Sequence, residues 1–340
     1  MPQAGRVKVT LAAAIVAAIA MFAPSANAQT NPYHRVENWA KLPEGRKWGS
    51  VSAVSVDAKG NVWAFERCGA NSCDGSDLAP ILEFDSSGKL VKSFGAGMFV
   101  FPHGIYVDKD GNVWATDAQG KDGKGHQVFK FSPDGKVLLT LGKAGVPGVG
   151  ENTFNSPSGV VTAKNGDIYV ADGHGGDTNA RIMKFTKDGK FVKAWGKKGA
   201  GPSEFAFLHG IALDSQGRVF VADRSNSRIE VFDGDGKFLA EWKQFGRPSA
   251  IYIDAKDTIY VTDSQSDEKT NPGVKMGIRI GSAKDGVVKE FIPVEASLEK
   301  AASAGAGAGV AAEGVVADAQ GNNVYGAETG TQYLRKYSKK

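Results

Sequence analysis

The sequence has little excess of charge of either sign. Its 340 residues carry 41 Lys and Arg against 37 Asp and Glu, a formal net charge of +4. A protein that binds nucleic acid or an anionic membrane surface usually has a much stronger basic bias. We therefore expect no nucleic-acid partner, and a ligand that is a small molecule or a short peptide.

Long hydrophobic runs are also scarce. The one such run covers residues 9–23, follows two basic residues and precedes small residues at 26–28. This order is typical of a secretory signal peptide, so residues 1–28 are predicted to be removed and residues 29–340 to be exported, to the periplasm or outside the cell. No later stretch approaches the ~20 apolar residues of a membrane-spanning helix, so no membrane span is expected.

Cysteine is almost absent. The two cysteines, Cys68 and Cys73, are separated by four residues. In an exported chain, cysteines this close in sequence are expected to form a disulfide. A loop this short gains only about 2 kcal/mol from the crosslink, so the main predicted effect is to stiffen the segment after Arg67.

Internal repeats, in contrast, extend along the chain. Six segments share an alternating apolar strand, a turn that usually contains Gly, and a second strand that ends at an acidic residue; they start at Ser52, His103, Ser158, His209, Ser249 and Glu313. Alternation with Asp-Gly and Asn-Gly turns indicates antiparallel strands. The starts lie 40 to 64 residues apart, as in four-stranded propeller blades. We predict an all-β fold, a single six-bladed β-propeller over 29–340, closed by an N-terminal strand that residues 34–42 supply.

The residue that starts each repeat alternates between Ser and a potential metal ligand. In a propeller the first strand of each blade lines the central channel, so His103, His209 and Glu313 should converge on the axis from alternate blades. Two imidazoles and a carboxylate suit a transition metal, with zinc the first expectation. The position of Glu313 is the least certain, because the low-complexity stretch 301–312 precedes it. The alternative is that the histidines only form hydrogen bonds within the channel.

The residues after the second strands are predicted to lie at the same end of the channel. Acidic residues recur there in every repeat, which favours a role in turn and loop hydrogen bonding. Arg67 and Arg224 do not recur, so they are candidates to hold a substrate carboxylate. His174 lies in the glycine-rich segment ADGHGGDTNARI, whose glycines let its imidazole approach a ligand closely. For all three, an ordinary surface-loop role is the alternative.

The repeats resemble the NHL repeat, and most of the chain after residue 28 resembles the peptidyl-α-hydroxyglycine α-amidating lyase family. The segments that carry the resemblance are WAFERCG, FPHGIYVDKDGNVWATD, HQVFKF, ADGHGGDTNARI, FLHGIALD and VADRSNSRI. The resemblance implies a six-bladed propeller with a channel zinc, for which His103 and His209 match two of three histidine ligands. Arg67 and Arg224 match arginines near the family's substrate. The carbonyl of Ile105 matches a position that helps to bind a calcium ion.

Three positions depart from the family pattern. Glu313 replaces the third zinc histidine, Gly314 replaces an aspartate ligand of the calcium, and His174 replaces a tyrosine proposed for catalysis. The implied reaction cleaves the C–N bond of an α-hydroxyglycine-type carbinolamide to an amide and glyoxylate. In that reaction His174 would take the proton, while Arg67 and Arg224 would hold the carboxylate. A lactone or ester hydrolase and a non-catalytic binding propeller remain alternatives.

Overall fold

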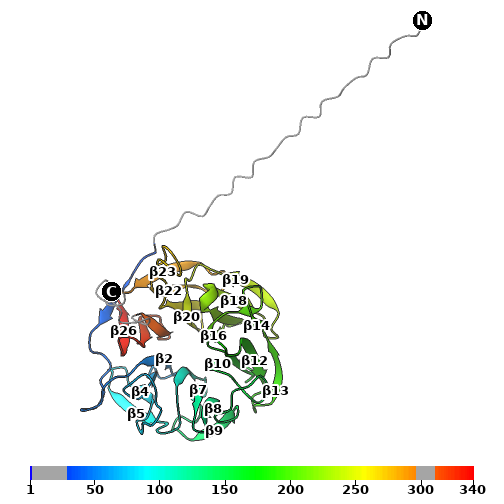
Figure 1. Ribbon diagram of the computed structural model, residues 1–340. Coiled ribbons are helices and arrows are strands. Elements are labelled where there is room, and N and C mark those ends of the chain that lie inside the picture. The colour runs from blue at the N-terminus through cyan, green and yellow to red at the C-terminus, as the bar shows by residue number, and fades with distance from the viewer. Residues whose placement is uncertain (2–28, 296–310) are drawn as a thin grey trace.

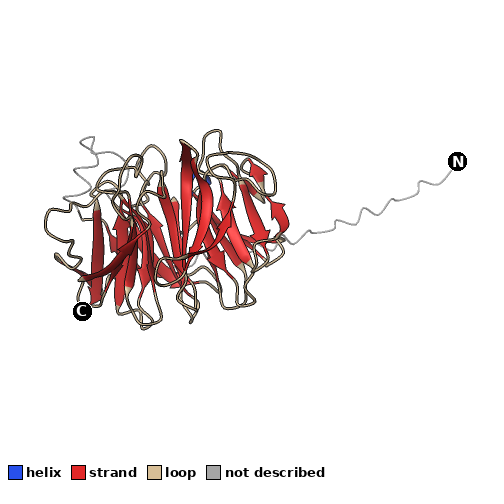
Figure 2. Cartoon of the chain, turned by 90° about the horizontal axis from the view of Figure 1, so that it is seen from below, coloured by secondary structure: helices blue, strands red, loops and turns tan. Residues whose placement is uncertain are grey.

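The computed structural model describes Met1, residues 29–295 and residues 311–340. The predicted signal peptide, apart from Met1, and most of the low-complexity stretch 301–312 lie outside the described residues. Within them, six four-stranded antiparallel sheets are arranged around a central axis, in sequence order (Figure 1). The side view shows the strands running between the two faces of the ring (Figure 2). The predicted all-β six-bladed propeller is confirmed.

Each blade is a meander whose first strand lies next to the axis. Blade 1 comprises β2 (Val51–Val56), β3 (Val62–Glu66), β4 (Ile81–Phe84) and β5 (Leu90–Phe94). Blade 2 comprises β6 (Pro102–Val107), β7 (Val113–Lys121), β8 (Lys124–Phe131) and β9 (Val137–Leu141). Blade 3 comprises β10 (Pro157–Thr162), β11 (Ile168–Asp172), β12 (Arg181–Phe185) and β13 (Phe191–Trp195).

The second half of the ring repeats this order. Blade 4 comprises β16 (Leu208–Leu213), β17 (Val219–Asp223), β18 (Arg228–Phe232) and β19 (Phe238–Trp242). Blade 5 comprises β20 (Pro248–Ile253), β21 (Thr258–Asp263), β22 (Gly277–Ser282) and β23 (Val288–Pro293). Blade 6 comprises β24 (Ala312–Ala317), β25 (Asn323–Glu328), β26 (Tyr333–Lys339) and β1 (Tyr33–Val36). Short extras are the parallel pair β14 (Lys197–Lys198) and β15 (Glu204–Phe205) and the 3-10 helix Arg224–Asn226.

The turn between the first two strands of a blade follows directly from its sequence. In blade 2, Asp108 Oδ1 accepts hydrogen bonds from the backbone N–H groups of Asp110 (3.0 Å) and Asn112 (2.9 Å). Gly111 has a φ of 82°, a left-handed conformation that glycine adopts without strain. Because most of the other blades carry a similar Asp and Gly, the repeat visible in the sequence is a repeat of this turn.

An N-terminal strand closes the ring, as predicted, although it is shorter than expected. β1 pairs antiparallel with β26, from Tyr33 opposite Lys339 to Val36 opposite Lys336. The predicted strand ran to residue 42, but Asn38 has a φ of 51°, which ends the extended conformation. The chain then crosses to blade 1.

Beyond β1, the N-terminal segment joins the first and last blades. Trp39 packs between Phe84 of blade 1 and Tyr325 of blade 6, with ring centroids 6.3 and 5.0 Å away. The backbone N–H of Lys41 donates to the carbonyl of Gly88 (2.9 Å). The same segment therefore supplies a strand to blade 6 and a packing contact to blade 1.

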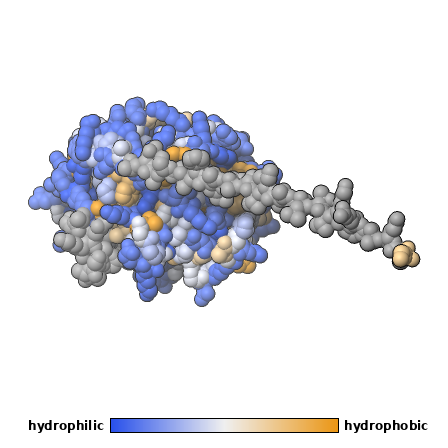
Figure 3. All heavy atoms as spheres, turned by 90° about the horizontal axis from the view of Figure 1, so that it is seen from above, coloured by the Kyte–Doolittle hydropathy of each residue, from blue (hydrophilic) through white to orange (hydrophobic). Residues whose placement is uncertain are grey.

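The core lies between adjacent blades. Between blades 1 and 2, the rings of Phe65, Phe99 and Phe131 are fully buried and pack against one another. Each buried side chain of this size contributes about 1.5–3 kcal/mol relative to exposure. In the face shown in Figure 3, hydrophilic side chains predominate and apolar ones are scattered.

Cys68 and Cys73 form a disulfide with a Cα–Cα distance of 5.1 Å, as the sequence predicted. The disulfide holds the loop that follows β3 and Arg67. In the part of the chain that the structure describes, no helix has both the length and the apolar character needed to cross a bilayer.

Candidate metal and anion site

Three imidazoles meet at one end of the channel. His103 lies on β6 and His209 on β16, whereas His174 lies in the loop after β11. The ring centroid of His103 lies 4.4 Å from that of His174 and 4.8 Å from that of His209. The centroids of His174 and His209 are 5.1 Å apart. One ring nitrogen of each residue lies within 4.8 Å of the other two.

The backbone of the following blade fixes the orientation of two of these rings. His103 Nδ1 lies 2.7 Å from the carbonyl oxygen of Ser158, and His209 Nδ1 lies 2.9 Å from that of Ser249. A carbonyl only accepts, so Nδ1 carries the proton and Nε2 keeps its lone pair. The serines at the alternating positions thus orient the imidazoles through their backbone oxygens.

The three Nε2 atoms form no hydrogen bond within the part of the chain that the structure describes. Nε2 of His103, His174 and His209 is buried in each case, without a hydrogen bond to any described residue. An unsatisfied buried polar atom costs about 1–3 kcal/mol, so three in one cluster favour the binding of a ligand at this point. Three imidazole nitrogens are a common protein ligand set for zinc.

Burial and nearby arginines keep the cluster neutral. Burial, with Arg67 as the next cause, lowers the pKa of His103 to about 3. Burial also lowers the pKa of His174 and of His209 well below the usual 6.5. All three rings are therefore unprotonated at neutral pH, the state that binds a metal.

Two buried arginines flank the cluster, and each stacks on an aromatic ring. The guanidinium carbon of Arg67 lies 3.7 Å from the centroid of Phe101, and that of Arg224 lies 4.1 Å from the centroid of Phe207. Burial lowers the pKa of both arginines to about 10, so both stay charged at neutral pH. Arg67 donates through Nε to the carbonyl of Pro102 (3.0 Å) and through Nη1 to Asn71 (2.6 Å).

Glu313 lies beside the histidines, but its two carboxylate oxygens have different neighbours from the pair of histidines that the sequence predicted. Its Oε2 is 3.9 Å from His209 Nε2, and its Oε1 is 3.5 Å from Arg224 Nη1. The group of potential ligands brought together is His103, His174 and His209. The sequence grouped His103 and His209 with Glu313; the structure brings His174 close to both of these histidines and places Glu313 between His209 and Arg224.

His174 reaches the other two histidines because its loop packs closely against Phe207 of the next blade. Gly175 has a φ of 75°, and a Cβ atom there would lie 2.3 Å from the ring of Phe207. The backbone N–H of His174 donates to Thr178 Oγ1 (2.7 Å), and its ring packs edge-on against Phe207 at 4.6 Å. The sequence signal was the glycine-rich loop itself, which predicts a close approach of the imidazole to a ligand, whereas the role of base came from the family resemblance.

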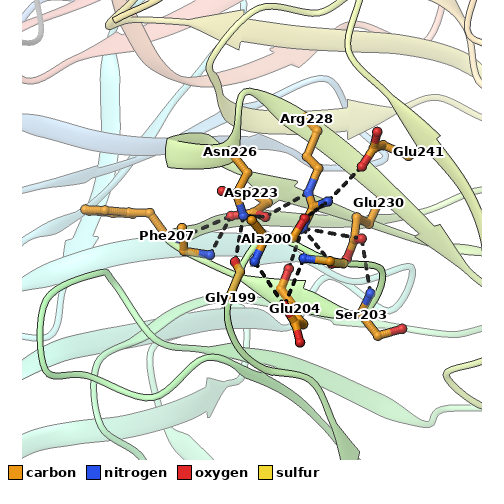
Figure 4. Close-up of polar contacts among 12 residues, drawn as sticks. Gly199, Ala200, Ser203, Glu204, Phe207, Asp223, Asn226, Arg228, Glu230 and Glu241 are labelled. Atoms are coloured by element: carbon orange, nitrogen blue, oxygen red, sulfur yellow. Dashed lines mark hydrogen bonds and ion pairs between the residues drawn. The ribbon is translucent and has the colours of Figure 1, made fainter.

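The recurring acids hold the loops that carry these residues. Asp223 accepts hydrogen bonds from the backbone N–H of Phe207 (3.2 Å) and from Asn226 (2.6 Å), and it pairs with Arg228 at 3.0 Å (Figure 4). Arg228 extends the network to Glu241. This network fixes Phe207, on which Arg224 stacks.

A cavity of about 1040 Å³ runs along the axis from His103, His209 and Glu313 towards the opposite face of the ring. Ile105 and Gly314 line it. A Cβ atom at Gly314 would lie 2.8 Å from the Cα of Ala53, so an aspartate would not fit there without a backbone shift. The calcium site implied for Ile105 thus has no carboxylate at this position, and calcium binding stays a prediction.

The comparisons with known proteins agree with this fold. A family model described as a 6-bladed beta-propeller matches residues 150–271. Over 203 residues the chain is 37% identical to the peptidylglycine α-amidating monooxygenase of Rattus norvegicus, which covers 52% of this chain and 20% of the relative. It is 36% identical over 208 residues to the peptidyl-α-hydroxyglycine α-amidating lyase 1 of Drosophila melanogaster, covering 53% and 37% of the two chains.

A third relative carries the repeat in its name. The chain is 35% identical over 211 residues to the human (Homo sapiens) NHL repeat-containing protein 3, covering 60% of this chain and 58% of the relative. The resemblance to NHL-repeat propellers and amidating lyases is confirmed at the level of sequence similarity. The match spans less than two thirds of each of these relatives.

Solved structures resemble the fold at low sequence identity. A gluconolactonase from Xanthomonas campestris has a TM-score of 0.58 and 14% identity, and covers 86% of this chain and 87% of its own. A streptogramin B lyase has a TM-score of 0.56 and 15% identity, covering 91% and 98%. At these identities the likeness concerns the propeller fold alone.

Proposed function

We propose that this protein is an exported, metal-dependent lyase that cleaves the C–N bond of an α-hydroxyglycine-type carbinolamide, a small acid or short peptide with a free carboxylate. The observation that carries the proposal is the group of three neutral imidazoles with unpartnered Nε2 atoms, flanked by two buried, charged arginines. The 32–37% identity to named amidating lyases and monooxygenases supports the same reaction class.

The three histidines would hold the metal, and zinc suits the ligand set best. A zinc ion bound there would lower the pKa of the substrate hydroxyl into the neutral range. Imidazole ligands also suit iron and copper. Calcium would bind through backbone oxygens such as that of Ile105.

The remaining parts of the reaction come from the chain itself. Arg67 and Arg224 would hold the substrate carboxylate, since guanidinium groups bind carboxylates in a bidentate manner. With His174 among the ligands, the role of base passes to Glu313, whose Oε2 lies next to His209. It would take the proton of the hydroxyl as the carbonyl forms and the C–N bond breaks. The proton then returns to the departing nitrogen, which gives an amide and a glyoxylate-type acid.

Export is part of the proposal. The disulfide is typical of proteins outside the cytoplasm, and residues 1–28 have the pattern of a signal peptide. A lactone hydrolase on the same propeller is less well supported, because calcium-dependent propeller hydrolases use mostly acidic and amide ligands, whereas three imidazoles meet here.

Metal analysis together with an activity assay tests the proposal. The untagged protein should contain close to one equivalent of transition metal and should release glyoxylate from an N-acyl-α-hydroxyglycine. His103→Ala should lose both, whereas His34→Ala, which changes an exposed histidine of β1, should keep both. A metal-free wild type, or release of glyoxylate that His103→Ala leaves intact, would refute it. A non-catalytic propeller would show no turnover at all.

A further inference from the structure

A third arginine, Arg247, stands at the channel mouth, at a position that the sequence repeat does not mark. It directly precedes β20, as Phe101 precedes β6 and Phe207 precedes β16. The strand registers match, because Pro102 pairs with Asp117, Leu208 with Asp223 and Pro248 with Asp263. Its side chain therefore starts at the same level of the mouth as the two rings on which the other arginines stack.

The backbone anchor is also equivalent. The N–H of Arg247 donates to Asp263 Oδ2 (3.1 Å), just as the N–H of Phe207 donates to Asp223 (3.2 Å). The blade thus presents a guanidinium where two other blades present a phenyl ring. Arg247 is close enough to Arg224 to contribute to the lowered pKa of that residue.

The three arginines differ in how many of their N–H donors form hydrogen bonds with the protein. Arg67 donates through Nε and Nη1 to protein oxygens. The Nε atoms of Arg224 and Arg247 are buried and have no hydrogen-bond partner among the described residues. Since an unpartnered buried donor costs about 1–3 kcal/mol, two such donors on neighbouring arginines point to an acceptor that comes from outside the protein.

The charges at the mouth are also unequal. Glu313 pairs with Arg224 at 3.5 Å and partly offsets the lowering of the Arg67 pKa by burial, whereas no carboxylate of the described residues forms an ion pair with Arg247. Asp267 lies near enough to Arg247 to interact with its charge. However, Asp267 is exposed, and its Oδ1 already accepts hydrogen bonds from the backbone N–H groups of Thr270 and Lys269. One substrate carboxylate leaves this excess of positive charge uncompensated.

We infer that Arg247 provides a second anion subsite beside Arg224, and that the preferred ligand is an acid with two anionic groups, such as an α-hydroxyglycine derivative whose acyl part carries a second carboxylate. The inference rests on the proposed function for the reacting half of that ligand. For the second anion it rests only on the arginines. Arg247 is thus a specificity-determining residue.

Binding of two stable analogues tests the inference without turnover. N-Succinylglycine and its neutral terminal amide have the same shape and differ by one negative charge. By calorimetry, the wild type should bind the diacid at least about tenfold more tightly, the effect of one charge-assisted pair. Arg247→Gln should reduce the preference to about twofold or less. Lys269→Gln, which removes a positive charge from an exposed position of the neighbouring loop, should leave it unchanged.

Equal or undetectable binding of the two acids by the wild type would overturn the inference, and so would an Arg247→Gln variant that keeps the tenfold preference. The wild-type comparison decides the question even if that variant does not fold. Failure of the lyase proposal would look different: the diacid would bind with the predicted preference, while its α-hydroxylated counterpart released no glyoxylate.

Discussion

At the scale of single residues, the positions of His174 and Glu313 favour His174 as a metal ligand and Glu313 as a base, the reverse of the roles expected from the sequence. His174 contributes one of three adjacent ring nitrogens, whereas Glu313 has one oxygen towards His209 and the other towards Arg224. A ligand and a base respond differently to substitution, because removal of a ligand lowers metal affinity and removal of a base lowers only the rate.

We therefore expect His174→Ala to lose most of its bound metal and Glu313→Gln to retain it. Glu313→Gln should still lower kcat by about 100-fold or more, the usual contribution of a general base. Metal content by elemental analysis and glyoxylate release, measured on both variants, check this. Full metal occupancy in His174→Ala, or loss of the metal in Glu313→Gln, would restore Glu313 as the third ligand.

The repeat comparison could identify His103 and His209, but not the role of His174. Residues that start the first strand occupy equivalent positions in every blade, so the sequence alone indicates that they converge. The loop after the second strand differs in length and course between blades, and the reach of its side chains depends on contacts such as that of Gly175 with Phe207. Arg247 was missed because its position in the other blades holds no cation.

At the scale of elements, the loop between β11 and β12 positions His174 through a close contact. Gly175 and Gly176 both have left-handed φ values, 75° and 55°, but only Gly175 has a neighbour within reach of a new Cβ, the ring of Phe207. An alanine at either position pays the same kind of backbone cost.

Gly175→Ala should therefore weaken metal binding at least about tenfold, because His174 or Phe207 must move, and a displaced ligand typically costs this much. Gly176→Ala should affect metal binding much less, with a similar change in melting temperature. Metal titration of both variants against a competing chelator provides the measurement. Equal affinities would mean that the loop does not position the ligand.

Each blade has an acidic residue near the end of its second strand, and Asp117 of blade 2 differs from the other five. Those five pair with arginines; the pairs are Glu66–Arg46, Asp172–Arg181, Asp223–Arg228, Asp263–Arg279 and Glu328–Arg335. Among the described residues Asp117 has no arginine partner, and Gln127 stands opposite it in the register. Burial raises the pKa of Asp117 to about 6, although the N–H groups of Val100 and Phe101 donate to it.

A pH dependence of stability follows. The folded pKa of about 6 lies above the ordinary value of about 3.9, so between these values the folded state binds more protons than the unfolded state. The stability from this group is therefore present at low pH and is lost as the pH rises through about 6. Relative to Asp117→Asn, the wild type should be about 1 kcal/mol more stable at pH 5 than at pH 7.5. Urea unfolding at both pH values tests this, and parallel profiles of the two proteins would contradict it.

At the scale of the whole molecule, most of the ring could be predicted because its turns and strands repeat in the sequence. Closure was predicted from counting: the sixth blade has only three strands after residue 311, so its fourth had to come from the other end of the chain. The length of the closing strand was not predictable in this way, because Asn38 ends it through a local backbone conformation. The N-terminal segment is then held by packing: Tyr33 is 3% exposed and donates its hydroxyl to the carbonyl of Gly321 at 2.9 Å.

Removal of residues 29–36 should open the ring between blades 6 and 1. The deletion exposes the edge of β26, loses four paired residues and removes the buried ring of Tyr33, together worth several kcal/mol. For a chain of this size that corresponds to a drop in melting temperature of roughly 10 °C. The free edge should also promote association, so light scattering should rise with protein concentration.

His34→Ala, which alters an exposed side chain of the same strand and leaves its pairing intact, should melt like the wild type. Because the histidine cluster draws its members from blades 2, 3 and 4, on the far side of the ring from the opening, the truncated protein should bind metal below its melting temperature. A truncated chain with an unchanged melting temperature would show that β1 does not hold the ring closed.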